Sequence, residues 1–346
     1  QGYFKKVVAD YGLAHCIQLN QEVVETGWTD DGWQVTTASG DCHRADVVIA
    51  ATGVLHYPRF PDIDGLDSFA GECFHSAQWP DGIDLHGKRV AVIGNGSTGV
   101  QLVTALVEQA AHVDHFQRSP QWIMPVLDCE YSEEDKARFR ADPAAIDAIR
   151  YDPDYIANVR RFNDAIVDPG SDAMQIIAEI VRDHLETAVT DPVLREKLRP
   201  DYVAACKRLI YSPSYYAAVQ RPNVAVVREA IAQVEAEGIR THDGALHTAD
   251  VIILATGFHA DKFVRSINPV GRDGVTLESL WARRASAFLA VSLPNFPNFF
   301  MLNGPTGPVG NFSLIDIAEA QWGYIDQLLD LLRTGQAGAI SASSAA

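Results

Sequence analysis

The sequence is poor in several features that would place it in other classes of protein. No apolar run approaches the roughly 18 residues that a membrane-spanning helix needs. Positive charge is also scarce, because 28 lysines and arginines stand against 45 acidic residues and give a net charge of −17. This balance argues against nucleic acid, and against an acidic membrane surface, as the binding partner.

Cysteine is equally scarce, with five residues and no Cys-x-x-Cys pair. The odd number and the spacing favour neither a disulfide framework nor a zinc site, so we expect no metal ligands. The missing pair also argues against the disulfide reductases. Cysteines without a disulfide pattern are typical of a reducing compartment, and we therefore predict a cytoplasmic protein.

Residues 88–99 carry the pattern around which the chain is organised: an apolar strand, a glycine turn and the start of a helix. A dinucleotide-binding βαβ unit opens in this way. Gly94 is expected to make the turn, Gly96 to let a pyrophosphate approach the backbone, and Gly99 to let the helix pack on the strand. The free N–H groups of the helix N-terminus would bind the pyrophosphate, and further cofactor contacts are expected from Ser97, Thr98 and Gln101.

The end of the next strand indicates which dinucleotide is bound. Residues 112–116 read as that strand and are followed by Gln117-Arg118-Ser119. An NAD site usually has Asp or Glu here, which accepts a hydrogen bond from the ribose 2′-hydroxyl. A guanidinium and a hydroxyl favour a 2′-phosphate instead. We therefore predict NADP, with Arg118 and Ser119 as ligands; a solvated surface arginine is the alternative.

One strand pattern occurs twice in the sequence. Residues 45–53 and residues 249–257 both run Ala-Asp, then an apolar stretch, then Ala-Thr-Gly, and each copy follows a hairpin pattern. Each apolar stretch suits a strand that is buried on both faces of a sheet. A plain core strand is the alternative for either copy alone. The repetition predicts two nucleotide-binding halves, with cofactors near the backbone at Thr52, Gly53, Ala255, Thr256 and Gly257.

The N-terminal part of the chain alternates and turns like a β-meander. Within residues 13–53 we expect strands at 17–19, 22–28 and 33–37. Residues 54–66 are rich in Pro and Asp and read as a crossing between domains.

Two later segments have a different character. Residues 131–203 read as a helical insert that begins with the capping pattern Ser-Glu-Glu-Asp at 132–135. Residues 294–312 are rich in Gly, Pro and Asn and precede a last amphipathic helix. This glycine turn before a helix would suit a polar or anionic ring edge, with Asn311 as a cofactor-binding candidate; a long surface loop is the alternative.

A specific pattern lies just before the glycine turn, formed by Phe69, Gly71, His75, Trp79 and Pro80. It resembles the fingerprint of the type I Baeyer–Villiger monooxygenases. The stretch 116–120, the pair Lys207–Arg208 and the segment 297–300 are also similar to that family. Related flavin-containing monooxygenases and N-hydroxylases usually lack the Trp-Pro ending.

The resemblance implies an α/β fold with two dinucleotide-binding, Rossmann-like domains, of which the FAD domain is incomplete. Residues 1–60 would form part of the FAD-binding domain. Residues 61–210 would form the NADP-binding domain, with the helical insert at about 131–203. Residues 211–346 would return through the NADP domain into the FAD-binding domain, bringing the second Ala-Thr-Gly strand, the glycine-rich loop and the last helix.

The resemblance also implies FAD, NADPH and O₂ as reactants, and a ketone that is converted to an ester or lactone. Arg208 matches the residue that stabilises the oxygenated flavin and the developing oxyanion, a task that suits a permanently charged guanidinium. Lys207 would join Arg118 in binding the 2′-phosphate. His75 is expected to govern the geometry of the domain linker rather than the chemistry.

The sequence departs from the family pattern in one respect. The family has a first GxGxxG for FAD near its N-terminus, and this sequence has only the motif at Gly94. We therefore expect a fragment that is cut at both ends. Two alternative hypotheses are an N- or S-oxygenating flavin-containing monooxygenase and a non-catalytic NADP-binding fragment.

Overall fold

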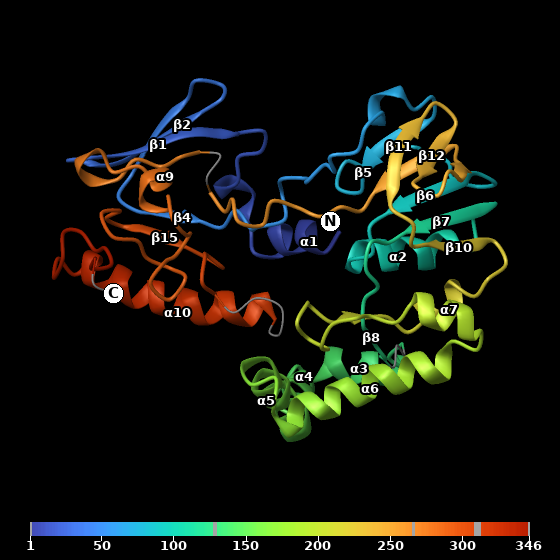
Figure 1. The fold of residues 1–346 in the computed structure, drawn as a ribbon. Coiled ribbons are helices and arrows are strands. Elements are labelled where there is room, and N and C mark those ends of the chain that lie inside the picture. Colours follow the sequence, from blue (N-terminus) through green and yellow to red (C-terminus); the bar gives the residue numbers. More distant parts are fainter. Residues whose placement is uncertain (1, 127–129, 265–266, 308–312, 345–346) are drawn as a thin grey trace. The chain divides into compact units, whose positions relative to one another are not determined.

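The structure is a computed structural model that describes residues 2–126, 130–264, 267–307 and 313–344. It divides into two compact units, which are drawn in Figure 1. Unit 1 holds residues 1–54 and 260–346, and unit 2 holds residues 55–259. The first crossing thus follows residue 54, whereas the sequence analysis put this boundary after residue 60. The second crossing follows the second Ala-Thr-Gly, which the sequence analysis had grouped with the return into the FAD-binding domain.

Unit 2 is built on a five-stranded parallel sheet in the order β10-β7-β6-β14-β5. The strands are β5 (Glu72–His75), β6 (Arg89–Ile93), β7 (His112–Phe116), β10 (Val224–Val227) and β14 (Val251–Leu254). Because neighbouring strands are parallel, their carboxyl ends meet at one edge, which is where such sheets bind ligands. The expected strands at 90–93 and 112–116 are thereby confirmed.

The two faces of this sheet pack against different elements. Val90 and Val92 share one hydrophobic cluster with helix α2 (Ser97–Leu106). Ala91 and Ile93 point the other way, since strand residues alternate, and share a cluster with residues of a small antiparallel sheet. That sheet consists of β11 (Ile231–Glu235), β12 (Gly238–Thr241) and β13 (Leu246–Thr248). Figure 1 shows α2 and the β11–β12 pair on opposite faces.

Helices occupy the region expected to be a helical insert. They are α3 (Glu133–Ala141), α4 (Ala144–Arg150), α5 (Pro153–Val167), α6 (Asp172–Ala188) and α7 (Pro192–Lys197). The insert is followed by the short helix α8 (Tyr215–Ala218). The start predicted at Ser132 is confirmed, because its hydroxyl accepts a hydrogen bond from the Asp135 N–H. The short strands β8 (Ile123–Met124) and β9 (Ile210–Tyr211) flank the insert and pair in parallel.

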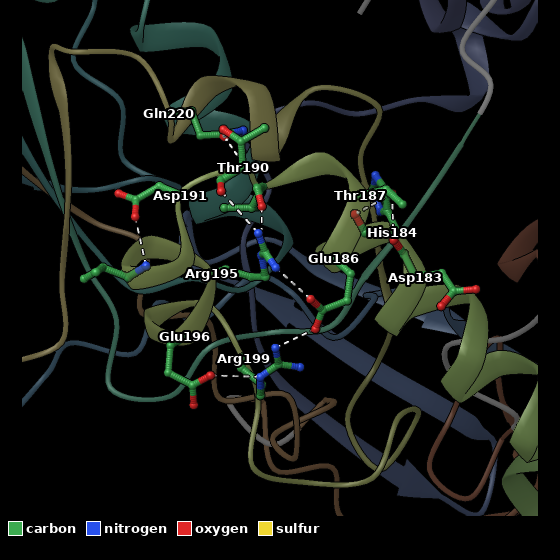
Figure 2. Close-up of polar contacts among 12 residues, drawn as sticks. Asp183, His184, Glu186, Thr187, Thr190, Asp191, Arg195, Glu196, Arg199 and Gln220 are labelled. Carbon is green, nitrogen blue, oxygen red and sulfur yellow. Dashed lines mark hydrogen bonds and ion pairs between the residues drawn. The ribbon is translucent and has the colours of Figure 1, made fainter.

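Helix α6 attaches the insert to the sheet. Its apolar stripe, which the sequence predicts, is buried in the same cluster as β6. At its C-terminal end Glu186 accepts hydrogen bonds from Arg195 at 3.0 Å and from Arg199 at 2.5 Å, and Figure 2 shows the carboxylate between the two guanidiniums. These two hydrogen bonds lower the pKa of Glu186, and the bond from Arg199 has the larger effect. The ion pairs therefore hold the α6–α7 corner together.

Unit 1 combines two small sheets with helices. Its elements are α1 (Gly2–Asp10), β1 (Val23–Thr29), β2 (Gly32–Thr37), β3 (Cys42–Ala45), β4 (Val48–Ala50), α9 (Leu277–Leu280), β15 (Phe299–Met301) and α10 (Leu314–Arg333). Strands β1, β2 and β3 form an antiparallel meander, and β4 pairs with β15 in parallel. Trp33, Trp281 and Phe296 form the centre of an aromatic core.

Two expectations for unit 1 are wrong. Residues 17–19 do not form a strand; they follow a short 3₁₀ turn and are exposed, and Asn20 then turns the chain with a left-handed φ of 57°. Strand β4 is half-buried rather than buried on both faces, because β15 is its sole partner among the described residues. Within the described part of the chain, no helix has the length and apolar character needed to span a membrane.

The packing of α6 predicts unequal effects of two neighbouring substitutions. Ile177 is 4% exposed and Ile176 is 41% exposed. Ile177→Ala should lower the free energy of unfolding by about 2–5 kcal/mol, because it leaves a cavity in the core. Ile176→Ala should cost well under half as much. Denaturant unfolding of both variants measures the difference, and equal losses would contradict this packing.

Candidate functional site

The glycine turn after β6 has no room for side chains at two positions. Gly94 has a φ of 109°, and a Cβ there would lie 2.4 Å from the Ala255 carbonyl oxygen. A Cβ on Gly99 would lie 2.0 Å from the Gly94 oxygen, so the helix approaches the turn closely. At Gly96, in contrast, no heavy atom of the described residues lies within 4 Å of such a Cβ. The turn is thus packed against protein on one side and open on the other.

The open side leads to the N-terminus of α2. Gly96 is the N-cap residue, no side chain among the described residues caps the helix, and the first turn has no acidic residue. The first N–H groups of a helix have no partner within the helix and attract anions. Ser97 is half-buried here, and Thr98 and Gln101 are exposed. This geometry fits a pyrophosphate.

A group of basic residues follows the carboxyl end of β7. The pairing of β8 with β9 brings two segments side by side, and Lys207 Nζ donates to Ser119 Oγ at 3.0 Å. The same ammonium lies 4.2 Å from the ring centroid of Tyr202. Arg118 and Arg208 are exposed and form no ion pair with any residue that the structure describes. We call Arg118, Ser119, Lys207 and Arg208 the basic cluster; its unneutralised charge fits a phosphate group.

The fingerprint residues are organised along β14. A Cβ on Gly71 would lie 2.3 Å from the Asp250 oxygen and 2.8 Å from ring atoms of Phe69, which explains the Phe-x-Gly spacing. Strand β5 pairs with β14 so that His75 lies opposite Leu254. His75 Nε2 then donates to the Gly257 oxygen at 3.0 Å. The fingerprint segment and the second Ala-Thr-Gly segment are therefore in direct contact.

His75 lies next to both segments that lead to unit 1. The Arg59 N–H and His75 share the Gly257 oxygen as acceptor, and Thr256 donates to the Arg59 oxygen. The imidazole is fully buried, and burial lowers its pKa. The imidazole is covered by neighbouring residues and bonded to the Gly257 carbonyl, and its role in the linker stays a prediction. Elsewhere in the fingerprint, the exposed Trp79 packs edge-on against Phe74 and precedes the half-buried Pro80.

The structure also contains functional candidates that the sequence reasoning missed. Buried His115 donates from Nε2 to the Gly94 oxygen at 3.1 Å, and its Nδ1 accepts from the Tyr215 hydroxyl at 3.2 Å. Asn95 Nδ2 donates to the Gln117 side-chain oxygen and to the Ser119 carbonyl. The one available signal was the position of Asn95 inside the Gly-x-Gly pattern.

The remaining candidates, Thr52, Gly53 and Asn311, belong to unit 1. Thr52 and Gly53 follow β4 and are exposed, and Gly53 has a φ of 70°. Such a backbone accepts a close ligand at low steric cost. Asn311 lies outside the described residues.

Comparison with known proteins places the chain in a family. Residues 1–140 match the family model described as pyridine nucleotide-disulphide oxidoreductase. The whole chain is 42% identical to an uncharacterized monooxygenase of Mycobacterium tuberculosis and spans 69% of it. Ninety-five per cent of the chain is 34% identical to a Baeyer–Villiger monooxygenase of Streptomyces coelicolor, of which it spans 63%.

A solved structure agrees with these relatives. The chain superimposes along 100% of its length on cyclohexanone monooxygenase from Rhodococcus sp. Phi1 bound to NADP+, with a TM-score of 0.87 and 32% identity, and covers 71% of that chain. The fold class predicted from the sequence is thereby confirmed. The chain belongs to the type I Baeyer–Villiger monooxygenases. It is thus a member of a family of flavin-dependent oxidoreductases.

Buried His115, which donates to the Gly94 oxygen of the glycine turn, predicts that the free energy of unfolding depends on pH. Burial lowers the pKa of His115 from its usual 6.5 to about 4, which corresponds to about 3 kcal/mol. Because the unfolded chain takes up the proton first, this stability is present above about pH 6.5 and is lost as the pH falls towards 4. His115→Gln should remove that part of the pH dependence.

Denaturant unfolding of the wild type, His115→Gln and the control His43→Gln at several pH values tests this expectation. The control changes an exposed histidine of β3 and should leave the pH dependence of the wild type intact. The assignment is wrong if His115→Gln loses stability with falling pH as steeply as the wild type does.

Proposed function

We propose that this protein is an NADPH- and FAD-dependent monooxygenase that inserts one oxygen atom of O₂ next to a ketone carbonyl and forms an ester or lactone. The observation that carries the proposal is the contact of Lys207 with Ser119, next to an Arg208 that has no ion-pair partner among the described residues. This contact supports a role for Lys207 at the proposed nucleotide site, and the absence of an ion pair supports a role for the Arg208 guanidinium in the reaction.

NADPH is proposed to bind at the carboxyl edge of the unit 2 sheet. The pyrophosphate would lie over Gly96 and the uncapped start of α2, where the backbone is open. The 2′-phosphate would contact the guanidinium of Arg118, the hydroxyl of Ser119 and the ammonium of Lys207. Charged hydrogen bonds to phosphate are among the strongest that a protein makes.

FAD is proposed to bind in unit 1, with Thr52, Gly53 and Asn311 among its contacts. When bound, it would supply the redox chemistry that activates O₂. The chain's own contribution is position and charge. Arg208 carries a permanent positive charge, so it can stabilise an oxyanion at any working pH. No carboxylate of the described residues competes for that charge.

The first experiment is a visible absorption spectrum of the protein after incubation with FAD and removal of the unbound flavin. Retained flavin absorbance that bleaches on addition of NADPH supports binding of both cofactors. A colourless protein that still binds NADPH would instead favour an NADP-binding fragment.

Replacing Arg208 separates the reaction from cofactor binding. Arg208→Ala should lower ester formation from a panel of ketones by at least about 100-fold, the usual effect of removing an oxyanion donor. Flavin reduction by NADPH should be largely kept, because Lys207 and Arg118 still bind the nucleotide. Product analysis and anaerobic reduction of the FAD-loaded protein measure the two steps.

Arg221→Ala is the matched control, because Arg221 is an exposed arginine of the same unit that faces Glu108 at 3.6 Å. It should leave both steps unchanged. An unchanged ester yield in Arg208→Ala would refute the role of Arg208. Hydroxylamine or S-oxide products without ester would instead identify an N- or S-oxygenating enzyme.

A further inference from the structure

We infer that Asn95 is a positioning residue that favours NADP over NAD without contacting the 2′-phosphate itself. Asn95 is the residue between Gly94 and Gly96, and its side chain bonds to the segment that carries the basic cluster. The inference rests on the proposed NADP site and adds to it the residue that holds the specificity-determining segment in place.

The Asn95 amide uses both of its N–H groups on that segment. Nδ2 donates to the Ser119 carbonyl oxygen at 2.7 Å and to Gln117 Oε1 at 3.0 Å. An amide nitrogen has two hydrogens, so this donor is fully used. The two acceptors flank Arg118, so the Ser119 backbone on one side of that residue and the Gln117 side chain on the other are tied to the glycine turn.

Gln117, the second acceptor, has a buried side chain. Its side chain is 3% exposed, and its Nε2 makes no hydrogen bond at standard geometry with the described residues. With Oε1 bonded to Asn95, the buried amide is held mainly by this one residue.

The turn has a second polar contact. Tyr215 donates to His115 Nδ1, and His115 Nε2 donates to the Gly94 oxygen, which can only accept. Hydrogen bonds therefore hold Gly94 through its oxygen and Asn95 through its side chain, and the Asn95 bonds connect the turn to the segment 117–119.

This arrangement acts on one cofactor and not on the other. NAD and NADP share the pyrophosphate, which the turn binds, and differ only in the 2′-phosphate, for which the proposed ligands are Arg118, Ser119 and Lys207. Residues that hold a ligand-binding side chain in position commonly influence the affinity of the site for the bound molecule. If the Ser119 backbone loses its hydrogen bond, the residues that bind the 2′-phosphate are no longer held in position. The pyrophosphate contacts remain.

The test measures binding of NADP+ and NAD+ to the chain and its variants by calorimetry. Asn95→Ala removes both hydrogen bonds, so we expect NADP+ affinity to fall about tenfold, in line with about 0.5–1.5 kcal/mol for each bond. NAD+ affinity should change by less than about twofold, so that the preference for NADP+ shrinks. Asn95→Ser has a single O–H and cannot donate to both acceptors, and it provides a second, milder variant.

Asn223→Ala is the matched control. The Asn223 amide donates to two carbonyl oxygens, those of Val107 and Ala110, and it precedes β10 at the amino end of the strand. Its loss should lower the thermal unfolding temperature and leave the ratio of the two nucleotide affinities unchanged. A structural role of Asn95 alone would make the two variants behave alike.

The outcomes separate this inference from the proposed function. If the wild type prefers NADP+ and both Asn95 variants keep that preference, the role of Asn95 is refuted while the NADP site stands. If both nucleotides lose affinity equally in Asn95→Ala, the residue supports the turn and not specificity. If the wild type binds NAD+ as tightly as NADP+, the 2′-phosphate site fails and the inference fails with it.

Discussion

The parallel pairing of β14 with β6 on one side and β5 on the other determines where the glycine turn and the fingerprint residues of unit 2 lie. Ala255 continues β14, donates to the Ile93 oxygen and places its own oxygen where a side chain on Gly94 would clash. On the other side the same strand crowds Gly71, and beyond it Gly257 accepts from His75. A shift in this register would displace the glycine turn and the fingerprint together, because sheet register is shared by every residue along a strand.

Local patterns were enough to predict the elements around this centre. The apolar strand 90–93, the glycine turn, the stripe of α6 and the cap at Ser132 each depend on residues within a few positions of one another. The periodicity of apolar residues and the capping of helix ends both depend on residues that are close in sequence. The strand expected at 17–19 was wrong for the complementary reason, since a short alternating stretch says nothing about whether a neighbouring strand is available.

Contacts between distant residues could not be predicted in this way. His115 and Tyr215 lie 100 positions apart, and neither has a neighbouring pattern that names the other. The two Ala-Thr-Gly strands differ little in sequence, yet one pairs with β15 in unit 1 and the other with β5 and β6 in unit 2. Which sheet a strand joins is decided by tertiary packing, and a single sequence gives no measure of it.

The basic cluster stands out electrostatically because the protein as a whole is acidic. With a net charge of −17, the surface as a whole repels a polyanionic nucleotide. That repulsion is screened beyond about 8 Å at physiological salt, so local charge decides binding. Arginines such as Arg199 and Arg240 pair with carboxylates, whereas Arg118 and Arg208 have no such partner among the described residues. A cation that is already neutralised would have to break an ion pair to bind an anion, whereas Arg118 and Arg208 would not.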